Sequence, residues 1–486
     1  MDTMTSLDLT ALLPAIIVTG TALFVLLLDL FIRSEQRQWL LWMSLMGIVA
    51  AGVANGLIPV QGAPLLQGMM RFDEISKAFN FLFLLGCGLA LMLSADYLVR
   101  QGIARGEYYA LVLLSTLGAM LMASSADLLM IFLGLETLSI PLYILATFLR
   151  HQTNSQEAGL KYFLLGAFSS ALFLYGIALV YGATGTTQLD TLFTILSESI
   201  EGEPLLLYAG VGLLLVGLAF KAAAVPFHTW APDVYEGSPT SATAFMAVVA
   251  KAAAFAALLR VFAFAFLALS SSWMFLMGIL AVLTMVLGNV VAVVQLNLKR
   301  LLAYSSIAHA GYLLIAVAST QNAMLLGPAT SSLLFYLLIY TFTTLGAFGV
   351  VILAESKGEN LSLTDLSGLA TRHPWVAAAM AIFMISLAGL PPTAGFFAKF
   401  YVFSTAIQAG ELGLALLGVL TSVISVYYYL RVVYYIYMRP TAVERPVYLS
   451  PLTVLGIALA AIGVLALGIY PPLALSWIPQ TLFVLP

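Results

Sequence analysis

About fourteen apolar segments, each long enough to cross a lipid bilayer, occupy most of the 486 residues. A helix needs roughly twenty residues to cross about 30 Å of hydrocarbon, and lipid offers no partner for an unpaired backbone group. Only 8% of the residues are charged, against about 25% in soluble domains. The sequence therefore predicts an all-α polytopic membrane protein. Its expected spans are residues 10–32, 37–57, 75–98, 107–125, 127–149, 157–183, 204–230, 238–267, 271–294, 297–319, 329–354, 374–408, 411–438 and 450–478.

Two of these segments carry the signature of a broken helix. The twelfth, residues 374–408, is too long for one span and contains the sequence GLPP. The seventh, residues 204–230, holds Pro226 late in its run. Proline removes a backbone donor and clashes with the preceding turn, so a break survives in lipid only beside protein or a wet cavity.

The two predicted breaks lie five helices apart. If helices 4–8 and 9–13 are copies, the second copy enters the membrane upside down, because five is odd. This is the inverted-repeat layout of many transporters, in which broken helices mark the transport pathway. We therefore expect a three-helix segment (1–106), a first repeat (107–267), a second repeat (268–438) and a last helix (439–486).

The basic residues predict the orientation of the chain. Cytoplasmic loops of membrane proteins are enriched in lysine and arginine. The loops after even-numbered helices contain essentially Arg71 alone, so we expect the odd loops in the cytoplasm and both termini outside a cell inner (plasma) membrane. The basic residues after odd-numbered helices are Arg33, Arg37, Arg100, Arg105, Arg150, Lys299, Arg300, Lys357, Arg372, Arg439 and Arg445.

Four ionisable residues lie inside the apolar segments: Glu136, Lys221, Lys251 and Lys399. Each charge opposes insertion by roughly 2.5–3.5 kcal/mol, which makes it a candidate for ion or proton transport. Glu136 is either a neutral, hydrogen-bonded acid or a carboxylate paired with Lys221. Lys221 and Lys251 are too deep to reach an interface, and Lys251 would connect the two repeats. Lys399 follows the second break.

Three further polar positions are more ambiguous. Lys161 lies one turn into its helix, four residues after Glu157. A salt bridge with Glu157 and a role in proton transport explain this lysine equally well. His309 is either a proton relay or a hydrogen-bonded core residue. His228 serves either a proton entrance or the headgroup zone at the end of the seventh helix. The tyrosines at 427–429 resemble an aromatic interface belt.

Other classes of function find no support in the sequence. There is no phosphate-binding loop, dinucleotide fingerprint, HExxH motif or histidine pair for haem. One cysteine, Cys87, cannot build a metal cluster. The net charge of −3 argues against nucleic acid. We expect no redox cofactor and no metal on this chain.

Four segments resemble the antiporter-like membrane subunits of respiratory complex I, over nearly the whole chain. They are LGLETLSIPLYIL, FKAAAVPFHTWAPDVYEGSPTSATAF, NLKRLLAYSSIAHAGY and SLAGLPPTAGFFAKFYVF. The resemblance extends to the homologous subunits of the photosynthetic complex. It implies fourteen helices, two inverted five-helix repeats and one proton-translocating unit.

The resemblance also assigns roles to the buried charges. It implies a charged pair of Glu136 and Lys221, a connector at Lys251, an exit-side group at Lys399 and a charged family position at Lys161. The resemblance implies an intermediate relay at His309 least directly, because some family members place their charges differently between helices 8 and 12.

The resemblance places the redox chemistry elsewhere. NADH, FMN, iron–sulfur clusters and quinone would belong to partner subunits, and this chain would contact other membrane and peripheral subunits, the lipid bilayer and protons. Two alternatives remain open at this point: a subunit of a multi-subunit cation/proton antiporter without redox chemistry, and a scaffold whose channel is idle.

Overall fold

The computed structural model describes residues 6–33, 36–198, 204–321, 323–356, 360–440, 446–476 and 478. Lys357 and Arg445, two of the residues used above to predict orientation, lie outside these ranges, as do both chain ends. The described chain is almost entirely helical. Its first part contains α1 (Ser6–Asp29), α2 (Gln38–Leu57), β1 (Gln61–Leu65), η2 (Leu66–Gly68), β2 (Met70–Phe72) and α3 (Glu74–Gln101).

Two groups of helices follow. The first contains α4 (Gly106–Ser124), α5 (Leu128–Ala146), α6 (Thr153–Thr184), α7 (Leu189–Glu198), α8 (Pro204–Ala222), α9 (Trp230–Gly237), α10 (Thr240–Phe245), η3 (Met246–Ala250), α11 (Lys251–Leu258), η4 (Leu259–Ala265) and η5 (Leu267–Leu269). The second contains α12 (Ser270–Val294), α13 (Leu298–Ala318), α14 (Ala323–Ala354), η6 (Leu363–Leu366), α15 (Leu369–Arg372), α16 (Pro374–Ala388), α17 (Ala394–Gln408) and α18 (Leu412–Met438), after which come α19 (Pro451–Ile469) and α20 (Pro472–Leu475).

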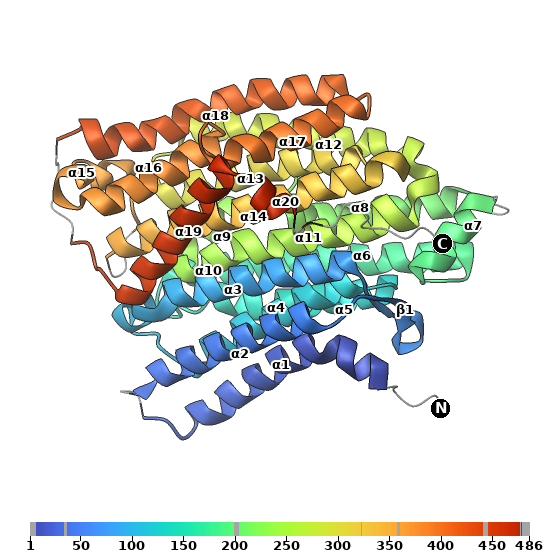
Figure 1. The fold of residues 1–486 in the computed structure, drawn as a ribbon, viewed down its shortest axis with the longest axis horizontal. Helices are drawn as coiled ribbons and strands as arrows, with labels where there is room; N and C mark the ends of the chain where they lie inside the picture. The colour runs from blue at the N-terminus through green and yellow to red at the C-terminus, as the bar shows by residue number, and fades with distance from the viewer. Residues whose placement is uncertain are drawn as a thin grey trace.

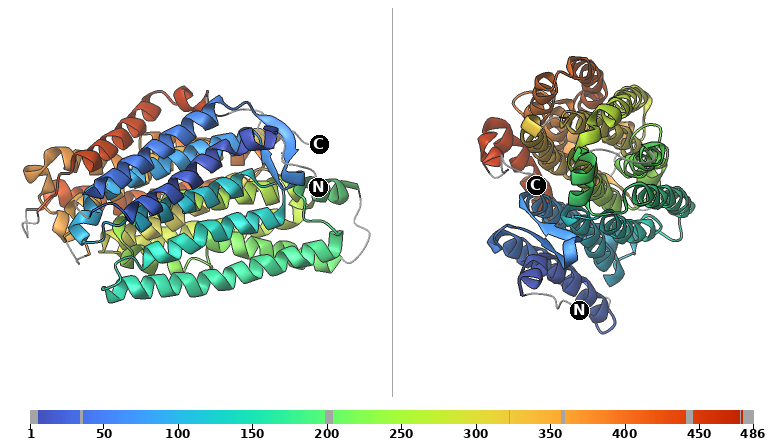
Figure 2. Two further views of the ribbon diagram at one scale, coloured as in Figure 1. Left: turned by 90° about the horizontal axis from the view of Figure 1, so that it is seen from below. Right: turned by 90° about the vertical axis from the view of Figure 1, so that its right-hand side faces the viewer.

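The predicted membrane architecture is confirmed. Thirteen described helices, counting the consecutive stretch 240–265 as one, are long and apolar enough to cross a bilayer, and α16 is a shorter apolar helix. Figure 1 shows these helices running side by side from α1 and α2 at one edge to α18 at the other, with α19 crossing the front over α14 and α3. The bundle is seen along the helices in the right-hand view of Figure 2. The most deeply buried spans are residues 240–265, α13 and α14, which places the core at the centre of the molecule.

Both predicted helix breaks are present. The seventh span stops at the end of α8, where Ala223 adopts a positive φ of 59°, and resumes as α9. The twelfth stops at the end of α16, where Gly389 has a φ of 80°, and resumes as α17. A cis proline, Pro226 or Pro392, lies in each break. The GLPP sequence and Pro226 therefore mark the breaks, as expected.

The two repeats share local contacts that the sequence similarity does not reveal. In the first, the backbone N–H of Leu128, at the start of α5, donates to Thr187 O at 3.0 Å. In the second, the N–H of Leu298, at the start of α13, donates to Leu361 O at 2.9 Å. Because five spans separate the two positions, the equivalent turns lie at opposite ends of the bundle, as an inverted repeat requires.

The helix that carries Lys251 is irregular. It combines α10, α11 and two π-helical stretches, η3 directly before Lys251 and η4 after it. π-helical turns are rare in proteins and occur frequently at functional sites. The whole stretch 240–265 is buried.

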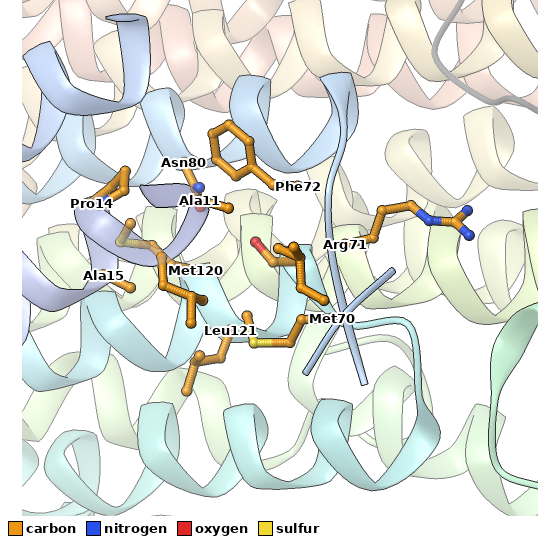
Figure 3. Close-up of a pocket in the computed structure, with 12 residues that line it drawn as sticks. Ala11, Pro14, Ala15, Met70, Arg71, Phe72, Asn80, Met120 and Leu121 are labelled. Atoms are coloured by element: carbon orange, nitrogen blue, oxygen red, sulfur yellow. The ribbon is translucent and has the colours of Figure 1, made fainter. Parts of the chain in front are cut away.

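One end of the bundle is closed by small elements that the sequence did not predict. The antiparallel strands β1 and β2 and the short helix α7 lie there (Figure 1), joined by an ion pair between Arg71 and Asp190. The small cavity beneath this hairpin, about 10 Å³ in volume, is lined mainly by apolar side chains, and Arg71 points away from it (Figure 3). This cavity contains none of the predicted site residues.

Candidate functional site

Lys221 lies in the last turn of α8, directly before the first break, and is 5% exposed. Its ammonium donates to Ser139 Oγ at 2.8 Å and to Tyr162 OH at 3.2 Å. The Nζ atom also lies 5.4 Å from the centre of the Tyr162 ring. Ser139 donates its own proton to Leu135 O at 2.6 Å. The oxygen of Ser139 is thereby oriented to accept from the ammonium.

Glu136 lies three residues before Ser139 on α5 and is partly exposed. Its charge acts on Lys221, but no direct ion pair joins the two among the described residues. The carboxylate oxygen Oε1 is buried without a hydrogen-bond partner. The structure thus brings the two predicted partners together as interacting charges, with Ser139 rather than Glu136 in contact with the ammonium.

Lys251 begins α11 and is 3% exposed. Its ammonium donates to the backbone oxygen of Ser306 on α13. Nζ lies 5.4 Å from the centre of the Tyr340 ring, and Tyr340 OH donates to Ser306 Oγ at 2.9 Å. Ser306 therefore connects the last helix of the first repeat to α13 and α14 of the second.

His309 occupies the centre of a cluster of tyrosines. Its Nδ1 is 2.6 Å from Tyr336 OH, and its Nε2 is 3.1 Å from Tyr429 OH. The ring of Tyr340 lies 5.3 Å away. A neutral imidazole donates from one nitrogen and accepts at the other, so a shift of tautomer exchanges the roles of its two hydroxyl partners. This geometry permits a proton to pass across the ring.

The interface-belt interpretation of the tyrosine run is wrong for two of its three residues. Tyr427 is 59% exposed, but Tyr428 and Tyr429 are fully buried. Tyr428 OH donates to Asn289 Oδ1 at 2.9 Å, while Tyr429 faces His309. Successive residues on a helix point about 100° apart, so a run of three cannot share one face.

Lys399 lies in α17, the second half of the other broken helix, and is 5% exposed. Its ammonium donates to Ala388 O, the last residue of α16, at 2.9 Å and to Ser422 Oγ at 2.7 Å. Nζ lies 5.2 Å from the centre of the Tyr312 ring. The lysine thus bonds a carbonyl that the helix break leaves without an intrahelical partner.

The three buried lysines share one environment. Each ammonium lies above a tyrosine ring and donates to neutral oxygen atoms. Burial disfavours the charged ammonium, whereas the ring face and the oxygens favour it. Burial and these contacts therefore act in opposite directions on the charged form of each lysine.

Lys161 is less buried than the other predicted lysines. Its side chain is 41% exposed and forms ion pairs of 2.7 Å with Glu157 and Asp233. Asp233 also pairs with Arg300 at 2.9 Å. The predicted pairing with Glu157 is therefore present, within a larger surface network.

His228 lies between α8 and α9, within the first break, and is half-buried. The sequence placed it at the end of the seventh helix, whereas in the structure the helix α8 ends at Ala222 and His228 lies in the segment between α8 and α9.

Glu355 and Lys299 form a buried polar junction that sequence reasoning missed. Thr240 Oγ1 donates to Glu355 Oε2 at 2.5 Å, and Lys299 Nζ lies 3.9 Å from Oε1. A cavity of about 30 Å³ adjoins them, and Ser238 Oγ and Gln101 Oε1, both buried beside it, have no hydrogen-bond partner among the described residues. This volume is large enough for one or two waters. Only the apolar run before Glu355 hinted at its burial.

No group of three or more metal-ligating side chains occurs among the described residues. Cys87 is buried.

Comparison with known proteins identifies the family. The model described as NADH:quinone oxidoreductase/Mrp antiporter, transmembrane, matches residues 125–425. NADH-quinone oxidoreductase subunit N of Trichlorobacter lovleyi is 46% identical over 477 residues, covering 98% of this chain and 97% of the relative.

Solved structures agree with this. A chain of respiratory complex I from Thermus thermophilus with bound aureothin has a TM-score of 0.81 at 40% identity, covering 96% of this chain and 99% of its own. A chain of the Mrp complex from Dietzia sp. shares the fold, with a TM-score of 0.86 at 24% identity over 99% of this chain and 98% of its own. The chain therefore belongs to the NADH:quinone oxidoreductase/Mrp antiporter family of membrane subunits, on the branch of subunit N of NADH-quinone oxidoreductase.

Proposed function

We propose that the chain translocates protons as a membrane subunit of NADH-quinone oxidoreductase, through a line of buried lysines and one histidine. One observation carries the proposal: three ammonium groups are each buried above a tyrosine ring, on helices linked through the core. The helix α8 packs against α11, and α13 contacts both α11 and α17. Residues with no transport role rarely keep such charges inside a membrane.

In the proposed path, Glu136 and Lys221 form the switchable pair of the first repeat. Lys251 connects the repeats through Ser306, and His309 relays the proton between Lys251 and Lys399. Both of these lysines act electrostatically on His309. The packing of α8 against α11 supports the step from Lys221 to Lys251. Lys161 and His228 are proposed to serve the approach from the cytoplasm.

The energy scale is compatible with such a path. Moving one proton against about 150 mV requires roughly 3.5 kcal/mol. An ion pair in a partly buried site, at an effective dielectric constant near 20, changes its energy by a similar amount when the charges separate from about 4 Å. Complete separation of such a pair therefore has about the energy of one protonation step, and a displacement from about 4 to about 8 Å supplies about half of it.

The remaining assignments are part of the same proposal. Residues 107–267 and 268–438 each form a half-channel, residues 1–106 the three-helix segment and 439–486 the last helix. The protein lies in the inner membrane with both termini outside. NADH, FMN, the iron–sulfur clusters and quinone are bound by partner subunits. The antiporter alternative shares the fold, but the relatives with over 40% identity are subunits N.

The test is proton pumping by the assembled complex. We expect Lys221→Ala and Glu136→Ala to leave assembly intact and to lower proton pumping sharply, because each removes half of the switchable pair. Lys77→Ala is the control, since the Lys77 ammonium donates to Ile58 O at 3.0 Å, outside the line of lysines. Pumping is measured by dye quenching in vesicles. Normal pumping by an assembled Lys221→Ala complex would contradict the proposal.

A further inference from the structure

A cavity of about 590 Å³ opens where two turns of the chain meet, the turn between α3 and α4 and the turn between α5 and α6. None of the residues proposed for proton transport lines it. Its lining is amphipathic, and we call its charged side chains the rim and its apolar side chains the floor. A ligand that combines an anionic group with an apolar chain would match both parts.

The rim is predominantly basic. Arg105, Arg150 and His151 line it, with one acidic residue, Glu107. Among the described residues, neither arginine side chain has a hydrogen-bond or ion-pair partner. Arg260, inside the bundle, is by contrast bound to a carboxylate and a carbonyl. The two rim arginines are thus available to an anion from outside the chain.

The floor continues into an apolar stripe. Leu111 and Ile144 line the cavity. On α4, which packs between α1 and α5, Leu111 is followed at helical spacing by the partly exposed Leu114 and Leu117. The rise from Arg105 to Leu117 is about 18 Å at 1.5 Å per residue, slightly more than half of the hydrocarbon thickness of about 30 Å.

We propose that this cavity binds an anionic membrane phospholipid, with its phosphate on Arg105 and Arg150 and one acyl chain along the leucine stripe of α4. The rim lies at the end of the bundle that the positive-inside rule assigns to the cytoplasm. Basic pockets between helices on that side bind anionic headgroups, and guanidinium groups bind phosphate oxygens with two parallel hydrogen bonds. The site is independent of the proton path.

A lipid fits better than a helix of a neighbouring subunit. A transmembrane helix seated on the stripe would have to place acidic or carbonyl groups opposite both arginines at its end. A phospholipid brings a phosphate and an acyl chain at the required separation in one molecule. Occupation by a protein helix is therefore an outcome that would overturn the proposal.

The test is a lipid titration of the purified full-length chain in detergent, followed by native mass spectrometry. The probes are phosphatidylglycerol and zwitterionic phosphatidylcholine. We expect tighter binding of phosphatidylglycerol, weakened about 5-fold by Arg105→Gln or Arg150→Gln and about 30-fold by both. Arg439→Gln is the control, because Arg439 lies over the Tyr435 ring at 4.4 Å, on α18.

Two further measurements keep the result unambiguous. The variant Arg105→Lys/Arg150→Lys, which keeps the charges, should bind phosphatidylglycerol more tightly than the double glutamine variant, whose melting temperature should match the parent. Equal affinity for both lipids, unchanged affinity in the double glutamine variant, or a neighbouring subunit's helix in the cavity of the assembled complex would each overturn the proposal.

Discussion

At the scale of single residues, the structure uses buried cations in two different ways. Arg260 is fully bound: its guanidinium donates to both oxygens of Asp73, at 2.5 and 2.6 Å, and to Ala123 O. Lys221, Lys251 and Lys399, in contrast, donate to neutral oxygens and lie over tyrosine rings. A guanidinium stays charged and holds a fixed geometry, whereas a buried lysine changes its protonation readily. Arg260 thus makes a fixed structural contact, whereas the lysines, as we propose, carry protons.

The anchoring role of Arg260 is testable. We expect Arg260→Leu to lower the free energy of unfolding by about 3 kcal/mol, because it leaves the partly buried Asp73 carboxylate without its cation. The double variant Arg260→Leu/Asp73→Asn should recover much of this loss, since it removes both charges and keeps an N-cap for α3. Thermal unfolding in detergent measures both. Equal stability of Arg260→Leu and the parent would show that the pair contributes nothing.

At the scale of elements, the two breaks use similar backbones but place their lysines differently. Lys221 precedes its break on the first half-helix, whereas Lys399 follows its break on the second and bonds back to Ala388 O. The sequence positions had indicated this difference. Gly389 is what permits the second arrangement: a Cβ there would lie 2.7 Å from Lys399 Cδ, at a φ of 80° that favours glycine.

Gly389 and Gly410 both have a positive φ, and comparing them separates backbone strain from displacement of the Lys399 side chain. We expect Gly389→Ala to lower stability by about 1–2 kcal/mol through backbone strain and also to lower proton pumping, because the methyl group displaces the Lys399 side chain. Gly410→Ala is the matched control, since Gly410 has a φ of 84° and a methyl group there would meet no atom within 4 Å. It should lose stability and keep pumping. Equal pumping by both variants would contradict the role given to Lys399.

The sequence predicted the spans, both breaks and the buried charges because each stands out from an apolar background. Prolines interrupt a helix, and a lysine inside twenty apolar residues is costly enough to indicate a function. Tyr429 and Ser306 were not predicted, because hydroxyl side chains are common in membrane helices and their partners lie far away in sequence. Tyr429 is 120 residues from His309. Glu355 looked like an ordinary residue at the end of a span.

At the scale of the whole molecule, Glu355 lies where three parts of the chain meet. Thr240 of the first repeat and Lys299 of the second bind its carboxylate. Arg100 of the three-helix segment donates to its backbone oxygen at 3.0 Å. The contacts on this one residue therefore join both repeats and the N-terminal segment at the end of the bundle assigned to the cytoplasm. A change in the charge of Glu355 therefore alters contacts with both repeats and with the N-terminal segment.

This junction predicts how the stability of the molecule depends on pH. Burial raises the pKa of the Glu355 carboxyl above its usual value near 4.5, although Lys299, the hydrogen bond from Thr240 and Arg100 oppose the shift. A carboxyl whose folded pKa is raised holds its proton more tightly when folded. Below the unfolded pKa it therefore costs no stability. Stability falls as pH rises from the unfolded pKa to the folded pKa, and above the folded pKa the loss is complete.

Glu355→Gln removes this ionisation and keeps the shape of the side chain. We expect the melting temperature of Glu355→Gln, relative to the parent, to rise as pH is raised from 5 to 8, because only the parent loses stability by ionising a buried acid. Glu107→Gln is the control, since Glu107 is exposed, and its difference from the parent should stay constant with pH. Differential scanning calorimetry of the purified chain at several pH values gives both differences. A constant difference between Glu355→Gln and the parent would mean that Lys299, Thr240 and Arg100 fully offset the burial of the carboxylate.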